Sequence, residues 1–350
     1  MGMDESLASR VPSASMAPLP PVEQVRPGLW SVPVPMPNSS LRYVLVYVME
    51  TPKGFFLVDV GWNTDDAYDA LCDGLRQAGG SITDVAGMLV THIHPDHYGL
   101  AGRVREASGA WVSLHPADAR LIHERYDDPT SLLGEMGVML RRQGTPPEEI
   151  VALQSASMPV RGFVDACVPD VLLEDGAKPE VPGWDLTAIW TPGHSPGHLC
   201  FWEDTHRLLM SGDHVLPRIT PNVSFHPQAG PNPLGDFLDS LRKLESYKPD
   251  EVLPAHEFRF AHLQGRLDEL HAHHAQRFAE VVVAIRGGHT TAYDVAREMR
   301  WSRSWDRIEG FMRRAAVSEA AAHLAALEQR GIVREVVGEP SVWEVVEDQE

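Results

Sequence analysis

Cysteine is scarce in this sequence, and the cysteines present are poorly placed to act together. The 350 residues include three of them, and none forms a Cys-x-x-Cys pair. An odd number of widely spaced cysteines argues against a disulfide scaffold and against a thiolate zinc site. Cys72 lies in a helical pattern and Cys200 in an apolar strand-like run, so we expect buried, unreactive thiols.

Long apolar runs are also missing. No stretch approaches the ~18 apolar residues that a membrane-spanning helix needs, and the first twenty residues lack the continuous apolar core of a signal peptide. Their Pro/Ser-rich composition predicts a disordered N-terminal arm over residues 1–22. We therefore expect a cytoplasmic protein with no membrane partner.

Positive charge is in short supply. Lysine and arginine number 30 against 49 aspartate and glutamate residues, which gives a formal net charge of −19. Such a chain repels polyanions, so general nucleic-acid binding is disfavoured unless one face is locally basic. One locally basic stretch exists, and its six arginines are Arg297, Arg300, Arg303, Arg307, Arg313 and Arg314.

Histidine, in contrast, is abundant, with 17 copies. Three of them fall within the segment Thr91-His92-Ile93-His94-Pro95-Asp96-His97, directly after an apolar run that predicts a strand. Three imidazoles and a carboxylate can converge on a loop after a strand, but not along a regular strand. Neutral imidazole and carboxylate are ligands that zinc, iron and manganese accept without thiolates. The spacing therefore predicts a metal site.

Three more metal-ligand side chains follow apolar runs in the second half of the chain. His194 lies in the loop TPGHSPGH between two apolar runs, Asp213 follows RLLMSG, and His256 follows EVLPA. Each is thus expected near the end of a strand. Two strand-rich halves with polar loops after the strands favour a sandwich of sheets flanked by helices.

Together these motifs resemble the metallo-β-lactamase superfamily, especially its glyoxalase II-like branch. The resemblance covers about Trp30 to Glu257 and includes all seven ligand positions in order. It implies an α/β fold, the four-layer αββα sandwich, and two divalent ions, with Zn²⁺ preferred and iron or manganese as alternatives. It also implies that metal 1 binds His92, His94 and His194, that metal 2 binds Asp96, His97 and His256, and that Asp213 bridges them.

Asp59, in the segment LVDVGW, resembles a family residue that orients a metal-bound imidazole. The alternative is an ordinary turn residue before Gly61. His214 is a second open case, facing either the site or its own loop. A further group, His271, His273 and His274, occupies one predicted helix, where a packed or solvated helix face is favoured over a second metal site.

The resemblance implies hydrolysis by a metal-bridged hydroxide that attacks a carbonyl carbon. Asp96 would orient this nucleophile and could carry a proton to the leaving group. A thioester or a related activated ester or lactone suits the machinery, and we expect a small-molecule substrate of acyl or lipophilic character. The alternative is a metallo-endoribonuclease, because lactamase-like hydrolases with an associated winged helix include both activities.

The sequence predicts three regions: the arm, a catalytic domain over residues 23–260, and a winged-helix-like domain over residues 261–350. The last region shows helical patterns over His262–Arg286, Thr291–Met299 and Trp305–Arg330, followed by an alternating hairpin. Its third helix is poor in basic residues, whereas a recognition helix presents polar or basic side chains to base edges. We therefore favour packing or homodimerisation for this region over nucleic-acid binding.

A helical insertion is predicted within the catalytic domain, at about residues 116–170. Met136, Met139, Leu140 and Met158 lie within it. These side chains would give the insertion an adaptable apolar surface if it covers the metal site as a lid. They would otherwise form the insertion's own core.

Overall fold

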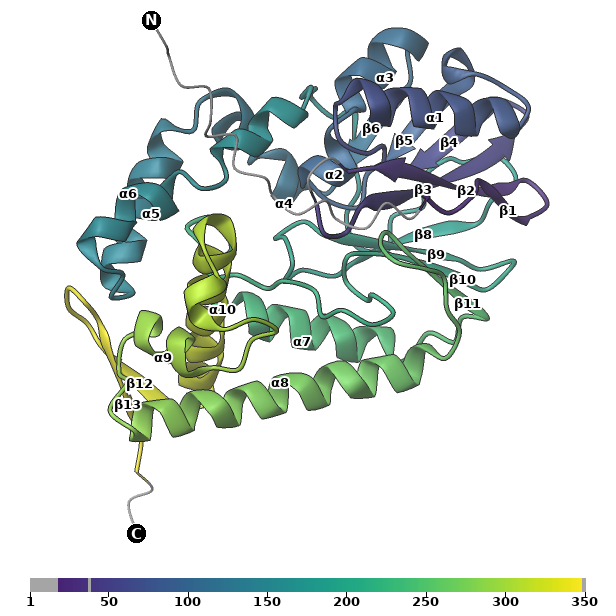
Figure 1. Ribbon diagram of the computed structural model, residues 1–350. Helices are drawn as coiled ribbons and strands as arrows, with labels where there is room; N and C mark the ends of the chain where they lie inside the picture. The colour runs from purple at the N-terminus through teal and green to yellow at the C-terminus, as the bar shows by residue number, and fades with distance from the viewer. Residues whose placement is uncertain (1–17, 37–38, 348–350) are drawn as a thin grey trace, which may run out of the picture.

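Two β-sheets form the centre of the protein, as Figure 1 shows for the computed structural model, which describes residues 18–36 and 39–347. Most of the predicted disordered arm lies outside these residues. The larger sheet has seven strands in the order β1-β2-β3-β4-β5-β6-β7. Their bounds are β1 (Glu23–Arg26), β2 (Leu29–Pro35), β3 (Tyr43–Thr51), β4 (Gly54–Val58), β5 (Val85–Leu89), β6 (Trp111–Leu114) and β7 (Val171–Leu172).

The second sheet has four strands in the order β11-β10-β9-β8. They are β8 (Leu186–Trp190), β9 (Leu199–Glu203), β10 (Leu208–Gly212) and β11 (Glu251–Pro254). Both sheets combine antiparallel and parallel pairs. β4, β5, β6 and β7 run parallel in the first sheet, and β10 runs parallel to β11 in the second.

Side chains along the strands alternate between two apolar layers. On β3, Val44, Val46 and Val48 pack on one side, while Tyr47 and Met49 point to the other, where they meet the second sheet. This period of two is the expected result of a pleated strand with both faces buried. It produces one core between the sheets and one core outside each of them.

Helices cover the outer faces of both sheets. The first sheet is covered by α1 (Asp65–Gln77) and α3 (Ala101–Ser108), and the second by α7 (Pro233–Leu244). Thr64 caps α1, because its side chain accepts a hydrogen bond from the backbone N–H of Ala67. The order helix, sheet, sheet, helix confirms the predicted mixed α/β sandwich.

The insertion is helical and has a small core of its own. Its elements are α4 (Pro116–Ala119), the π-helical turn η2 (His123–Asp127), α5 (Thr130–Arg142), α6 (Pro147–Gln154) and η3 (Met158–Phe163). Met136, Leu140 and Leu153 pack together, with Met139 against them. The apolar side chains of α5 and α6 therefore form the insertion's own core, as the alternative prediction stated. In addition, α6 contacts the C-terminal helix α10.

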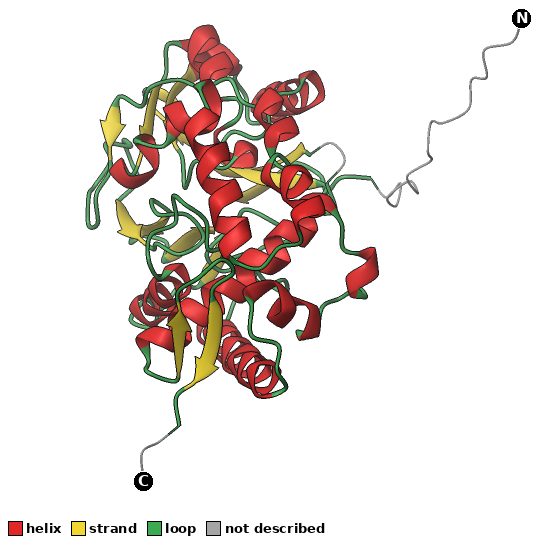
Figure 2. Cartoon of the chain, turned by 90° about the vertical axis from the view of Figure 1, so that its left-hand side faces the viewer, coloured by secondary structure: helices red, strands yellow, loops and turns green. Residues whose placement is uncertain are grey.

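The C-terminal region contains three helices and then a hairpin, in the predicted order. They are α8 (Leu263–Arg286), α9 (Ala292–Glu298), α10 (Gly310–Gln329), β12 (Val333–Val336) and β13 (Val342–Val345), and Figure 2 shows the hairpin near the C-terminus. The helix predicted over Trp305–Arg330 is wrong in one respect. It is divided into the turn η4 (Trp305–Arg307) and α10, because Arg313 donates to the carbonyls of Trp305 and Ile308.

These C-terminal helices share one continuous apolar core with α7 and the second sheet. Leu267 on α8, Phe237 on α7 and Leu324 on α10 belong to the same buried cluster. The region is therefore packed onto the sandwich rather than tethered beside it. Among the described helices, none is both long enough and apolar enough to cross a bilayer.

Candidate metal centre

The seven predicted ligands come from loops that follow strands. Thr91 to His97 follow β5 and enter the short helix α2 (Pro95–Tyr98), while His194 follows β8. Asp213 comes directly after β10 and His256 two residues after β11. The parallel pairs β4–β5 and β10–β11 bring their C-terminal ends to one edge of the sandwich, and the structure gathers all seven side chains there.

Three histidines form one half of the cluster. His92 Nε2 lies 2.9 Å from His94 Nδ1, which in turn lies 3.0 Å from His194 Nε2. These three nitrogen atoms satisfy the geometry expected of ligands to one ion. His94 presents Nδ1, and the other two present Nε2.

Two carboxylates and two histidines form the other half. His256 Nε2 lies 3.3 Å from both Asp96 Oδ2 and Asp213 Oδ1. His97 Nε2 lies 3.6 Å and 3.5 Å from the same two oxygens. The second carboxylate oxygen of Asp213 is 3.5 Å from His194 Nε2, so Asp213 lies between the two halves.

The outer Nδ1 of three of the rings is held by a hydrogen bond. His194 Nδ1 donates to the carbonyl of Asn222 at 2.8 Å, and His256 Nδ1 donates to the carbonyl of Tyr43 at 3.0 Å. His97 Nδ1 lies 2.7 Å from Asp59 Oδ2. Such bonds fix each ring and direct its Nε2 toward the centre, as they do for metal-bound histidines.

Three of the inward-facing atoms are left without hydrogen-bond partners. His97 Nε2, His256 Nε2 and Asp213 Oδ1 are buried, and none of them has a partner among the described residues. Burying unsatisfied polar atoms is costly. A divalent cation coordinated by imidazole nitrogen and carboxylate oxygen would remove this cost, so the donor set fits a metal centre.

Asp59 lies behind this centre and contacts two of its residues. Besides His97, its carboxylate accepts a hydrogen bond from the Thr91 backbone N–H at 2.8 Å and from the Thr91 hydroxyl at 3.0 Å. Its own backbone is left-handed, with φ of 62°. Asp59 thus contacts a predicted metal ligand from behind the centre, and its role in orienting that imidazole stays a prediction.

The two halves of the cluster differ in electrostatic environment. Burial, followed by His194 and Arg125, lowers the pKa of His94 well below its ordinary value. Burial opposes the charged form of His256 too, but Asp213 and Asp96 together outweigh it and raise the pKa to about 10. Protons and divalent cations therefore compete for the nitrogen that faces the carboxylates.

Asp118 is a positioning residue that sequence reasoning missed. This buried carboxylate accepts hydrogen bonds from the Ile93 N–H at 2.9 Å, the Ser195 hydroxyl at 2.8 Å and the Gly197 N–H at 2.6 Å. It thereby joins the His92–His97 loop to the loop that carries His194. At Gly197 an added Cβ would lie 2.6 Å from the Asp118 nitrogen, so a side chain does not fit there.

His198 is a second missed residue. Its Nε2 accepts a hydrogen bond from the Asp213 backbone N–H at 3.1 Å, and its Nδ1 lies 2.8 Å from the Thr191 hydroxyl. It therefore holds the backbone of Asp213 in place. The sequence carried a signal for His198, which closes the motif TPGHSPGH, whereas no local pattern marked Asp118.

The remaining candidate histidines do not join the seven predicted ligands, although His214 directly follows Asp213 and its ring centroid lies 5.8 Å from that of His198. His214 is buried against the ring of Phe237, with the ring centroids 4.7 Å apart. His274 is buried and pairs with His323, while His271 lies beside Glu245. Within residues 18–36 and 39–347, no group with metal-binding geometry includes any of them.

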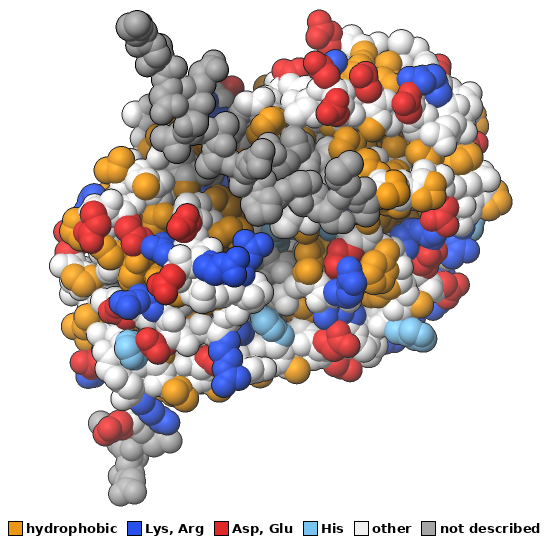
Figure 3. Space-filling model, viewed as in Figure 1, with side chains coloured by type: hydrophobic (Ala, Val, Ile, Leu, Met, Phe, Trp, Pro, Cys, Tyr) orange, Lys and Arg blue, Asp and Glu red, His pale blue; other side chains and the backbone are white. Residues whose placement is uncertain are grey.

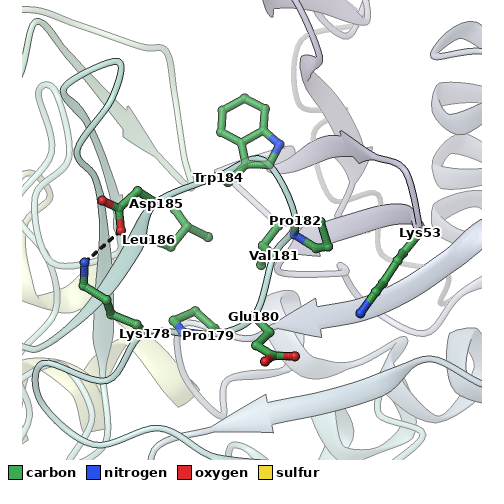
Figure 4. A pocket seen from close by; sticks show the side chains of 9 residues that line it. All are labelled: Lys53, Lys178, Pro179, Glu180, Val181, Pro182, Trp184, Asp185 and Leu186. Carbon is green, nitrogen blue, oxygen red and sulfur yellow. Dashed lines mark hydrogen bonds and ion pairs between the residues drawn. The ribbon is translucent and has the colours of Figure 1, made fainter.

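A surface cavity of about 440 Å³ lies away from the metal centre (Figure 4). It is lined by Lys53 and by residues 178–186, and Lys178 pairs with Asp185 at its edge. None of the seven ligand positions lines this cavity, so it has no part in the arrangement described above.

Comparison with known proteins places this fold and site in a family. The family model described as the metallo-beta-lactamase superfamily matches residues 40–256. The chain belongs to the metallo-β-lactamase superfamily. A solved structure of a metallo-beta-lactamase family protein from Thermus thermophilus is similar over 92% of this chain and 100% of that one, with 31% identity and a TM-score of 0.80.

Curated relatives are more distant in sequence. YqjP of Bacillus subtilis, named a probable metallo-hydrolase, is 23% identical over 318 residues, which cover 85% of this chain and 91% of that protein. The atrochrysone carboxyl ACP thioesterase dmxR1 of a Cryptosporiopsis species is 24% identical over 273 residues, which cover 78% of this chain and 67% of that protein. The family is thus one of metallo-hydrolases, some of them thioesterases.

Proposed function

We propose that this protein is a metal-dependent hydrolase of a thioester or a related activated ester or lactone. The observation that carries the proposal is the convergence of seven imidazole and carboxylate side chains, of which three inward-facing atoms are buried without a hydrogen-bond partner in the described part of the chain. A relative named as an ACP thioesterase supports the substrate class.

The proposed ligand assignment follows two of the three groups with metal-binding geometry, while the third group, His92, His97 and Asp213, spans both halves. His92, His94 and His194 would hold one ion, Asp96, His97 and His256 the other, and Asp213 would bridge them. Divalent ions bound there would supply a hydroxide near neutral pH and polarise the substrate carbonyl. Zn²⁺ is the first candidate, and iron and manganese suit the same donors.

The chain's own groups would position the reactants and move the proton. The Asp96 side chain is 13% exposed and points its Oδ2 toward His256, so it can contact both the cluster and an incoming molecule. We assign to Asp96 the orientation of the attacking water and the delivery of a proton to the departing thiolate. Water and thioester would thus yield a carboxylic acid and a thiol.

The structure weakens the support for the endoribonuclease alternative. Arg313 forms an ion pair with Glu149, and Arg314 is buried, so two of the six clustered arginines are not presented to solvent as a patch. On the face drawn in Figure 3, basic and acidic side chains are interspersed. We keep packing or homodimerisation as the proposed role of the winged-helix-like region at residues 261–350. The glyoxalase II-like branch and the cytoplasmic location stay predictions.

The test is metal analysis of the purified protein combined with a hydrolysis screen of acyl-thioesters, lactones, β-lactams and RNA. We expect bound divalent metal and cleavage of thioesters or lactones, lost in His94→Ala and Asp213→Ala. Activity that survives both substitutions would contradict the proposed site. RNA cleavage with strong salt dependence would favour the endoribonuclease instead.

A further inference from the structure

Two arginines from distant parts of the chain lie on elements beside the metal centre. Arg125 belongs to η2 in the insertion, and Arg314 lies in the second turn of α10. The residue after Arg125 anchors η2 to the ligand loop, because the Tyr126 hydroxyl donates to the carbonyl of Ile93 at 2.5 Å. The positive charge of Arg125 thus lies close to His94.

One loop connects the metal centre to both arginine-bearing elements. It follows β10, and its Asn222 carbonyl accepts the hydrogen bond from His194 described above. Farther along, the Phe225 N–H donates to the Ser318 carbonyl on α10 at 3.0 Å, and Gln228 Oε1 accepts from Arg125 Nε at 2.9 Å. Ser318 is four residues after Arg314, so both lie on the same face of α10.

Neither arginine forms an ion pair with a described carboxylate, although the chain carries 49 acidic residues, and Arg125 acts on the buried Asp118 carboxyl only from beyond ion-pair distance. Arg125 bonds only the neutral Gln228. Arg314 is 9% exposed, and its acceptors are the Leu153 carbonyl and the Ser157 hydroxyl. A guanidinium has five N–H donors, and burying its charge without an anion is costly.

The charges of the two arginines act on each other and on a histidine near them. Burial and the neighbouring Arg125 lower the pKa of Arg314 to about 10. Burial, followed by Arg125 and Arg314, lowers the pKa of His226 to about 3, so this imidazole is neutral. Next to the metal centre the protein therefore maintains a positive region that an anion would stabilise.

We propose that Arg125 and Arg314 bind an anionic oxygen group of the substrate, a carboxylate or a phosphate, beside the metal centre. The proposal rests on the hydrolase function proposed above and narrows its substrate class to thioesters and related esters that carry an anionic group. Guanidinium groups bind carboxylate and phosphate through paired, charge-assisted hydrogen bonds. The anion could belong to the acyl part or to the thiol that leaves.

Three thioesters separate these two sources. Acetyl-N-acetylcysteamine is neutral, succinyl-N-acetylcysteamine carries a carboxylate on its acyl part, and acetyl-coenzyme A carries phosphates on its thiol. The variants are Arg125→Gln and, as the matched control, Arg286→Gln, which removes an exposed arginine at the far end of α8. Arg125→Lys tests whether charge alone restores the function, and melting temperatures establish that each variant is folded.

We expect Arg125→Gln to raise KM about tenfold or more for one or both charged thioesters, the loss expected for a charge-assisted hydrogen bond. The KM for the neutral thioester should change less than that for the charged one, and Arg286→Gln should resemble the unmodified protein. The charged substrate that loses affinity identifies the position of the anion. Equal losses for all three substrates, or no loss for any, would overturn the proposal.

A binding measurement distinguishes failure of this proposal from failure of the hydrolase function. Calorimetric titration of the full chain with succinate and with inorganic phosphate needs no turnover, and it can be repeated after chelation to remove any contribution from bound metal. We expect Arg125→Gln to weaken binding of at least one anion about tenfold, whether or not thioesters are hydrolysed. Identical binding by the unmodified protein and Arg125→Gln would overturn the anion site.

Discussion

The protein buries two groups of histidines, and they differ in the charges that surround them. At the metal centre, His256 lies 3.3 Å from two carboxylates, and they raise its pKa to about 10. In the C-terminal helices, His274 Nδ1 lies 3.2 Å from His323 Nε2. No described carboxylate lies within ion-pair distance of that pair, and burial lowers its pKa values to about 2 and about 3.

This comparison shows what distinguishes a metal centre from a packed pair. Burial is common to both groups, and an unpartnered nitrogen occurs in both, since His274 Nε2 also lacks a partner among the described residues. Only the metal centre adds carboxylates at 3 to 4 Å and hydrogen bonds that direct several nitrogens inward. The carboxylates supply the charge that a cation needs, so the two groups should respond oppositely to metal and to pH.

The largest expected effect is that of metal removal. Chelation should abolish hydrolysis, and added Zn²⁺, Mn²⁺ or Fe²⁺ should restore it. The reason is that the attacking group in the proposed reaction is a hydroxide that the bound metal would supply. The melting temperature should also fall, since an ion that binds only the folded state stabilises it. Elemental analysis and activity of the same samples measure both. Full activity in protein shown to be metal-free would contradict the proposed chemistry.

A smaller but still large effect is expected from Asp213→Asn. The substitution keeps the size of the side chain and removes the charge between the two halves of the cluster. We expect kcat/KM to fall by about a hundredfold or more, which corresponds to a few kcal/mol of lost stabilisation. The matched control is His323→Leu, which alters the other buried group. An equal fall in both variants would show that the loss reflects packing.

The sequence alone identified the seven side chains that the structure brings together, because each follows a strand in a short, polar motif. His92 to His97 are local in the chain, and Asp213 and His256 are recognisable after their apolar runs. The first two strands were not predicted. β2 contains Pro33 and Pro35, which lack the N–H that a strand normally donates, and this obscures its pattern.

Other features depend on contacts that no local pattern contains. Asp118 and Arg125 lie in the insertion, where helical periodicity is the dominant signal, and their roles arise from distant partners such as Gly197 and Gln228. The break before α10 depends on Arg313 reaching back to the Ile308 carbonyl. Such long-range bonds become visible only when the chain is folded.

An intermediate effect is expected from Asp59→Asn, which tests whether Asp59 orients His97 toward the metal centre. Asparagine tolerates the left-handed backbone at this position, but it lacks the charge that holds His97 and the Thr91 hydroxyl. Loss of such a partner typically weakens metal affinity by about 10- to 100-fold. Competition with a coloured chelator measures this affinity. Asp66→Asn, at an exposed position on α1, is the control, and equal affinities in both variants would refute the orienting role.

The smallest expected effect concerns the pair His274 and His323, and its sign follows from their lowered pKa values. In the unfolded chain a histidine titrates near about 6.5, whereas in the folded protein these two titrate at about 2 and about 3. Between those values the unfolded chain binds more protons than the folded one. The stability that the neutral pair contributes is therefore complete above about pH 6.5 and is lost as the pH falls toward 3.

As the pH falls through that window, each histidine of the pair should lower the free energy of unfolding by up to about 1.4 kcal/mol per pH unit. Arg277 and Arg330, which also act on the pair, stay charged throughout and do not change this sign. The double variant His274→Leu/His323→Leu should show a shallower slope between pH 7 and pH 5 in urea titrations. Because the metal centre is the same in both proteins, its own pH dependence cancels in the difference. Parallel pH profiles would show that the pair is charged, or solvated, in the folded state.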